Sequence, residues 1–127
     1  MILFKQYFFP LILAGVKTET RRLGKKRWNV GSVHWACHKL FQTEPDCCIK
    51  ILGVKQERLS AITQEAVHRE GVIGTPAEFI AKFKEINKGK PMEPDPLVWV
   101  VSFKGFVSAF IHFKTMKFEV LPKHEPT

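Results

Sequence analysis

The sequence predicts a single α+β domain, a small mixed β-barrel with two or three short helices at its side. Three observations support this class. The 127 residues are the usual length of one folding unit, and 45% hydrophobic with 25% charged residues is an ordinary globular composition. Strand-like runs come from well-separated parts of the chain, between short helical segments. Since no apolar run reaches the roughly 20 residues that span a bilayer, we expect no membrane segment.

The N-terminal part is expected to alternate short elements. Met1 to Phe4 starts a strand, and Gln6 to Ala14 is apolar enough for a short buried helix. Pro10 is tolerated only in the first turn of that helix, and Gly15 ends it. Lys17 to Arg22 places two threonines in a polar, alternating run, which predicts a strand with one solvated face.

Two more strands are predicted after a basic loop at residues 24–27. In Ser32 to Leu40, Val33, Trp35 and Cys37 fall on one face of an alternating pattern, and we expect Trp35 to be buried with that face. Residues 42–46 form a turn, and the apolar run at residues 47–54 is the next strand.

Threonines mark the start of two helices in the second half. Thr63 begins a helical segment that ends at Gly71. Thr75 followed by Pro76 is a typical N-cap and first helical position. Four apolar residues of the second helix recur at helical spacing and predict a face that packs on the core: Phe79, Ile80, Phe83 and Ile86.

The C-terminal part is expected to be mostly β-structure. After a proline-rich loop, residues 97–103 form a nearly continuous apolar run, typical of a strand buried on both faces. Residues 106–113 and 116–121 predict two more strands, arranged as a hairpin. The tail from Pro122 is expected to fray.

Positive charge is concentrated near the N-terminus. The chain has 20 Lys and Arg against 12 Asp and Glu, and residues 1–39 hold eight of the basic residues and one of the acidic ones. Such a block is either a solubilising surface or a site for a polyanion such as RNA. We assign nucleic-acid contacts to four cations and to one ring that stacks on bases: Arg21, Lys25, Lys26, Arg27 and Trp28.

The cysteines predict neither a disulfide scaffold nor a metal site. Cys37, Cys47 and Cys48 make an odd count with two adjacent residues, which favours a reducing, cytoplasmic location. Strand alternation places Cys37 opposite His34 and His38, and no C-x-x-C pair is present. We therefore expect no metal and no other cofactor.

A longer motif begins in the first predicted helix. Residues 12–22 read Ile-Leu-Ala-Gly-Val-Lys-Thr-Glu-Thr-Arg-Arg, and residues 28–31 read Trp-Asn-Val-Gly. Both stretches resemble the opening of the ASCH family, and later segments up to Val98-Trp-Val-Val-Ser-Phe103 resemble the family in the same order. The resemblance covers about residues 1–104 of a single domain at 1–127, and residues 105–127 are an extension. It implies a PUA-like (ASCH) barrel that binds RNA or a nucleoside.

One branch of this family hydrolyses the acetyl amide of N4-acetylcytidine, and the chain resembles that branch. The resemblance implies that Lys17, Thr20 and Glu70 are catalytic, and that Arg22 binds substrate. Thr18, on the same predicted strand face as Thr20 and Arg22, is assigned to substrate binding as well. The alternative is a non-catalytic RNA-binding module, because lysines, arginines and hydroxyls are sufficient for phosphate contacts.

The amidohydrolase hypothesis sets a geometric condition. A threonine hydroxyl is a weak nucleophile, so Lys17 has to be neutral part of the time, with its pKa lowered by burial or by Arg22. In a regular strand Lys17 and Thr20 point to opposite faces, so we expect an irregular turn after Gly15 or a bulge. We also expect the segment from Lys17 to meet Glu70 at one rim of the barrel, within hydrogen-bond reach.

Overall fold

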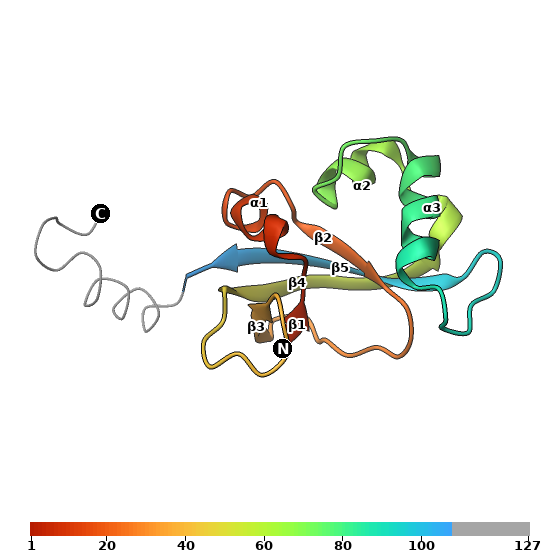
Figure 1. The fold of residues 1–127 in the computed structure, drawn as a ribbon. Helices are drawn as coiled ribbons and strands as arrows, with labels where there is room; N and C mark the ends of the chain where they lie inside the picture. The colour runs from red at the N-terminus through yellow and green to blue at the C-terminus, as the bar shows by residue number, and fades with distance from the viewer. Residues whose placement is uncertain (108–127) are drawn as a thin grey trace, which may run out of the picture.

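The computed structural model describes residues 1–107. Five strands form one mixed sheet in the order β1-β3-β4-β5-β2 (Figure 1). β1 pairs with β3 in parallel, and the other neighbours are antiparallel. The strands are β1 (Ile2–Leu3), β2 (Glu19–Arg22), β3 (Val33–Cys37), β4 (Cys47–Arg58) and β5 (Leu97–Phe106).

The sheet curls into a half-barrel, and its two edge strands approach each other. β1 and β2 are the opposite edges, yet Arg22 Nη2 on β2 donates a hydrogen bond to the carbonyl oxygen of Leu3 on β1 at 2.7 Å. A register shift between Ile51 and Gly53 interrupts the long β4–β5 ladder, and such a bulge increases the local bend. The predicted α+β class, with a barrel-like mixed sheet, is confirmed.

Three short helices accompany the sheet: α1 (Phe9–Leu13), α2 (Gln64–Arg69) and α3 (Pro76–Ile86). α1 continues from a 3-10 turn at Gln6–Phe8, has Pro10 in its first turn as predicted, and is followed by Gly15 at a φ of 77°. Figure 1 shows α2 and α3 close together, on the opposite side of the view from β1 and β3. None of the helices described is long and apolar enough to cross a membrane.

Both predicted N-caps are confirmed. The Thr63 hydroxyl accepts a hydrogen bond from the backbone N–H of Ala66 at the start of α2. Thr75 and Glu78 form a reciprocal capping box at the start of α3. These caps satisfy N–H groups that a helix start leaves without partners, which explains why local sequence predicts both starts correctly.

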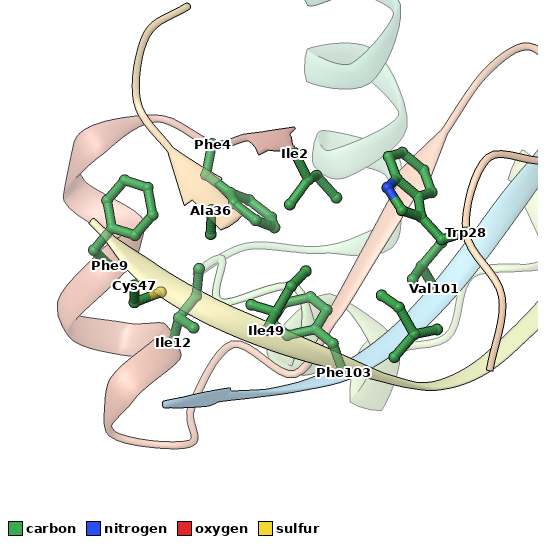
Figure 2. Close-up of a cluster of buried hydrophobic side chains, with 11 residues drawn as sticks. Ile2, Phe4, Phe9, Ile12, Trp28, Ala36, Cys47, Ile49, Val101 and Phe103 are labelled. Carbon is green, nitrogen blue, oxygen red and sulfur yellow. The ribbon is translucent and has the colours of Figure 1, made fainter. Parts of the chain in front are cut away.

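The main core lies between the curled sheet and α1 (Figure 2). Phe4 belongs to this core, and its ring contacts the rings of Phe9 and Phe103. A second cluster joins the other side of β5 to α3 through Val98, Val100 and Phe83. β5 is therefore buried on both faces along much of its length, as predicted.

Four element predictions are wrong. Ile86, assigned to the core-packing face of α3, is 58% exposed. On β3, Val33 and Trp35 are 54% and 45% exposed while Ala36 is in the core, because an alternating pattern alone does not show which face meets the core. β4 runs to Arg58, since its polar end pairs with the start of β5. Phe106 ends β5 and begins no new strand. The rest of the predicted hairpin and the tail lie outside the described residues.

Candidate active site and ligand cleft

Lys17 lies in an irregular turn between α1 and β2, which satisfies the condition set by its spacing from Thr20. The backbone N–H groups of Val16 and Lys17 both donate to the carbonyl oxygen of Leu11, at 2.8 and 3.1 Å. β2 begins only at Glu19. Strand alternation therefore does not apply to Lys17.

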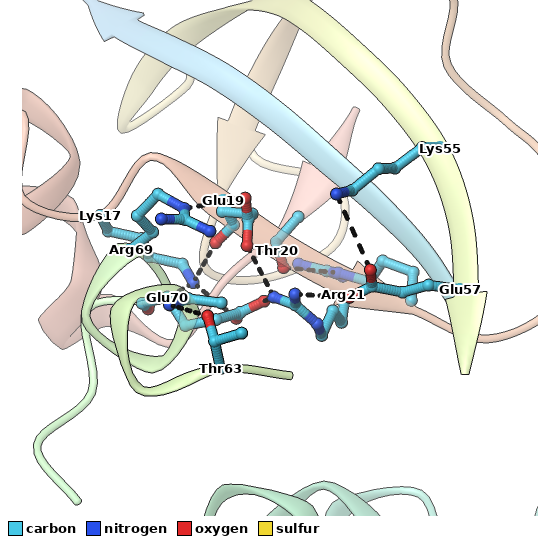
Figure 3. A network of polar contacts seen from close by, with 11 residues as sticks. Lys17, Glu19, Thr20, Arg21, Lys55, Glu57, Thr63, Arg69 and Glu70 are labelled. Carbon is cyan, nitrogen blue, oxygen red and sulfur yellow. Dashed lines mark hydrogen bonds and ion pairs between the residues drawn. The ribbon is translucent and has the colours of Figure 1, made fainter. Parts of the chain in front are cut away.

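The Lys17 ammonium is buried among acceptors (Figure 3). Its Nζ donates to the carbonyl oxygens of Glu19 and Glu70 at 3.0 and 2.7 Å, and to Glu70 Oε1 at 3.3 Å. It also lies 4.4 Å from the centre of the Phe8 ring, a cation–π distance. Burial lowers the pKa of Lys17, and the Glu70 carboxylate opposes this shift. Three acceptors match the three N–H groups of the charged form.

Glu70 is the C-cap residue of α2, and its carboxylate is divided between two cations. Oε1 faces Lys17, and Oε2 accepts a hydrogen bond from Arg21 Nη1 at 3.0 Å. Burial raises the pKa of the Glu70 carboxyl, while Lys17 and Arg21 both act against the rise. The predicted meeting of Lys17 and Glu70 is confirmed.

Gly71 allows this contact to form. Its φ of 79° is in the left-handed region, which favours glycine. A Cβ atom at this position would lie 2.9 Å from Lys17 Cβ, closer than two such atoms approach. The end of α2 therefore packs directly on the Lys17 side chain because residue 71 has no side chain of its own.

Thr20 and Arg22 form a second pair on the other face of β2. Arg22 Nε donates to Thr20 Oγ1 at 3.2 Å, and the guanidinium carbon lies 5.1 Å from the centre of the Phe4 ring. Thr20 is only 4% exposed. Among the described residues, no hydrogen bond joins the Thr20 hydroxyl to Lys17 or Glu70. The structure thus pairs two of the predicted catalytic residues, Lys17 and Glu70, with each other, and pairs the third, Thr20, with the predicted substrate-binding residue Arg22.

A cleft of about 920 Å³ opens beside these pairs. Lys17, Arg21, Arg22 and Glu70 line its inner part, and Thr20 is absent from the described residues that line it. The volume is near the upper limit for small-molecule pockets. The outer walls add four further cations: Lys5, Arg27, Lys82 and Lys90.

Thr18 is not placed where the strand pattern predicts. It precedes β2 and lines a separate cavity of about 630 Å³, together with Arg69 and Ser102. Its backbone N–H donates to the carbonyl oxygen of Arg69 at 2.8 Å. Thr18 therefore does not line the cleft beside Arg22; the regular strand begins at Glu19, two residues later than predicted, and the substrate-binding role of Thr18 stays a prediction.

The residues predicted to contact nucleic acid fall into an exposed group and a buried group. Lys25, Lys26 and Arg27 are exposed on the loop after β2. Arg21 is 6% exposed with its guanidinium among carboxylates, and Trp28 is 7% exposed within the main core. Arg21 and Trp28 are therefore buried, because acidic residues enclose the arginine and the indole fills core volume, and the nucleic-acid contacts assigned to them stay predictions.

Sequence reasoning missed the acidic partners of Arg21. Glu19 Oε1 and Glu57 Oε1 each accept a hydrogen bond from its guanidinium at 2.8 Å. The contact with Glu19 was predictable, because Glu19 and Arg21 are two residues apart on β2 and therefore lie on the same face. The contact with Glu57 was not predictable from local sequence, because Glu57 is 36 residues away on β4.

The cysteines form no site of their own. All three are buried, and burial, with the neighbouring Cys48 and Asp46, raises the pKa of Cys47 to about 12. A thiol held in its protonated form is a poor nucleophile. In residues 1–107, no three His, Cys, Asp or Glu side chains gather in a way that suits a metal ion.

Comparison with solved structures identifies the architecture. No family model matches the chain, and no curated protein matches its sequence. The ASCH domain from Lactobacillus crispatus JV V101 aligns with a TM-score of 0.63 and 19% identity, over 78% of this chain and 70% of that chain. The chain has the ASCH-domain fold. The fold expected from the motif at residues 12–22 is thereby confirmed.

Two further structures agree with this ASCH fold. Protein EF3133 from Enterococcus faecalis V583 aligns with a TM-score of 0.67 and 19% identity, over 95% of this chain and 77% of that one. ASCH from Zymomonas mobilis aligns at 0.57 and 10% identity, over 96% and 81%. At these identities the likeness concerns the fold, and the chemistry of the ASCH cleft has to be argued from its own residues.

Proposed function

We propose that the ASCH-fold cleft binds RNA or a nucleoside and hydrolyses an N4-acylated, cytidine-like amide. The observation that carries the proposal is the buried Lys17–Glu70 pair, 3.3 Å apart in the wall of the cleft. Burial shifts the two pKa values toward each other, down for Lys17 and up for Glu70. A proton then passes between the two groups at a smaller cost than it would in water.

Thr20 is the nucleophile in this proposal, and because its side chain is buried and does not line the cleft, substrate binding has to expose its hydroxyl. The Arg22 guanidinium, which donates to Thr20 Oγ1, stabilises negative charge as it develops on that oxygen. Oγ1 attacks the acyl carbon, and the hydroxyl proton passes to neutral Lys17 through an intervening water, because no hydrogen bond joins Thr20 Oγ1 to Lys17 or Glu70 in the described residues. The pair returns this proton to the leaving N4 amine as the C–N bond breaks. Water then hydrolyses the threonyl ester, which releases the acid and restores the hydroxyl.

RNA is the larger ligand that suits the outer cleft. Lys5, Arg27, Lys82 and Lys90 offer positive charge beyond the inner site, where phosphates flanking a bound nucleoside would lie. Tyr7 lines the same cleft and is 65% exposed, so its ring is available for stacking on a base. These features support a nucleotide within a strand as well as a free nucleoside.

The test is hydrolysis of N4-acetylcytidine, both as the nucleoside and within a short oligoribonucleotide. We expect cytidine and acetate in equal amounts, separated by chromatography, and no product from the Glu70→Gln variant. Release of no product from either substrate, by a protein shown to be folded, would overturn the hydrolase proposal.

A non-catalytic RNA-binding module is the second candidate. It is favoured by one observation, that Lys17 Nζ already has three acceptors and Thr20 Oγ1 is paired with Arg22. A site that only binds needs no proton transfer between these groups. RNA binding without any product in the same assay supports this candidate.

A further inference from the structure

We propose that Arg21 is a positioning residue, which fixes the Glu70 carboxylate so that one of its oxygens serves Lys17. The inference deepens the proposed function and rests on it, because the proton exchange between Glu70 and Lys17 belongs to that function. Arg21 acts through Glu70, and no chemical step is assigned to its own guanidinium.

Arg21 is held by carboxylates from three separate elements (Figure 3). Nη1 donates to Glu19 Oε1 on β2 and to Glu70 Oε2 at the end of α2, at 2.8 and 3.0 Å. Nη2 donates to Glu57 Oε1 on β4 at 2.8 Å. Because the guanidinium is a rigid plane, contacts at both of its terminal nitrogens fix its orientation. Glu70 Oε2 is thereby committed to Arg21, and Oε1 is left to face Lys17.

The carboxylates of Glu19 and Glu57 each contact a second cation. Arg69 Nε donates to Glu19 Oε2 at 3.2 Å, and Lys55 Nζ lies 3.7 Å from Glu57 Oε2. Both outer cations are substantially exposed, whereas the Arg21 side chain is 2% exposed. The network therefore runs inward from solvent and ends at the Glu70–Lys17 contact.

Stability alone explains this network poorly. Apolar replacements of buried ion pairs are often as stable as the pairs themselves. Here Arg21 Nε is also buried with no hydrogen-bond partner in the part of the chain that is described, and leaving such a donor unpaired is destabilising. A cost of this kind is expected where an arginine is required for the state of a neighbouring group.

The electrostatic role follows from the permanence of the arginine charge. Lys17 and Arg21 contact the Glu70 carboxylate, and Arg22 interacts with it over a longer distance. Arg21 keeps its proton at any working pH. When Lys17 is neutral, Glu70 is therefore still paired with a cation and is not left as an isolated buried charge.

The test is a titration of the glutamate side-chain carboxyls by ¹³C NMR in wild type, Arg21→Met and Arg21→Lys, with the Glu70 signal identified by its loss in Glu70→Gln. Arg21→Met should raise the pKa of Glu70 by about one pH unit or more, because a contacting opposite charge is lost. Arg21→Lys should shift it less. Arg69→Met, which removes a cation that touches Glu19 but not Glu70, is the matched control and should leave Glu70 nearly unchanged.

The outcomes separate this inference from the proposed function. An unmoved Glu70 titration in folded Arg21→Met overturns the inference, and so does failure of both Arg21 variants to fold, which assigns the residue to the fold alone. If the titration moves but wild type hydrolyses nothing, Arg21 still positions Glu70 and only the hydrolase is lost. If wild type is active, Arg21→Met should lower kcat by roughly tenfold or more with little change in KM, and Arg21→Lys should recover part of it.

Discussion

Two parts of one basic segment have opposite environments. Lys17 and Arg21 are buried, and carboxylates hold their charged groups. Lys25, Lys26 and Arg27, a few residues later, are exposed, and no ion pair engages them within residues 1–107. The difference does not come from residue type. It comes from acidic side chains that β4 and α2 bring to the first part and not to the second.

Buried and exposed charges in this segment are suited to different roles. Buried charges interact at short range and are little affected by salt, so they are suited to setting protonation states. Exposed charges attract a polyanion by releasing its counterions and are strongly screened by salt. We therefore expect changes in the buried part to alter turnover and changes in the exposed part to alter affinity.

The largest expected effect is loss of turnover in the buried part. Lys17→Ala, Thr20→Ala and Glu70→Gln should each lower kcat for N4-acetylcytidine at least about 100-fold, because groups that act as a unit lose nearly all function when one is removed. Arg22→Ala should also raise KM, since a guanidinium holds the ground-state carbonyl as well as the oxyanion. Steady-state kinetics measures this.

The control for this series is Lys50→Ala, an exposed lysine of β4 that does not line the cleft. Its kcat should equal that of wild type. If Thr20→Ala retains full turnover, Thr20 is not the nucleophile, and its pairing with Arg22 is structural.

A smaller effect is expected from the exposed part. Changing residues 25–27 together to Ala should weaken RNA binding for all sequences alike and reduce the slope of log affinity against log salt by about 2. Arg21 is left out of the set because it is buried. The measurement is fluorescence anisotropy over a salt series, compared with a triple change of exposed lysines that do not line the cleft: Lys50, Lys88 and Lys104. Equal losses in both triples would show that the loop is only one part of a diffuse positive surface.

Local sequence signals predicted much of this fold correctly. The N-cap threonines, Gly15 and Gly71 act within a few residues of themselves, so their elements were found close to their true positions. The continuous apolar run of β5 also correctly predicted that this strand is buried on both faces. The exposed face of β3 was assigned wrongly because Trp35 is apolar in sequence, while its exposure depends on how the sheet curls.

The candidate site was predictable only where one segment or a family motif carries it. Lys17, Thr20 and Arg22 belong to one short motif, and the resemblance added Glu70. The environment of Arg21 was not predictable, because it depends on Glu57, 36 positions away, and on Glu70, 49 positions away. Only the contact between Glu19 and Arg21 was indicated by local sequence, because residues two apart on a strand share a face.

The smallest expected effect compares one glycine from each environment. Gly71 packs on Lys17, and Gly24 opens the exposed loop; their φ values are 79° and 95°, so alanine is strained at both. Around Gly24 an added Cβ meets nothing within 4 Å, whereas at Gly71 it meets Lys17 Cβ.

Gly24→Ala should therefore cost about 1–2 kcal/mol of unfolding free energy from backbone strain alone. Gly71→Ala should cost about 1–3 kcal/mol more, because Lys17 or the end of α2 has to move. Urea unfolding of the two variants measures the difference. Equal losses would show that Lys17 is not packed against the end of α2, and the buried half of the comparison would then be wrong.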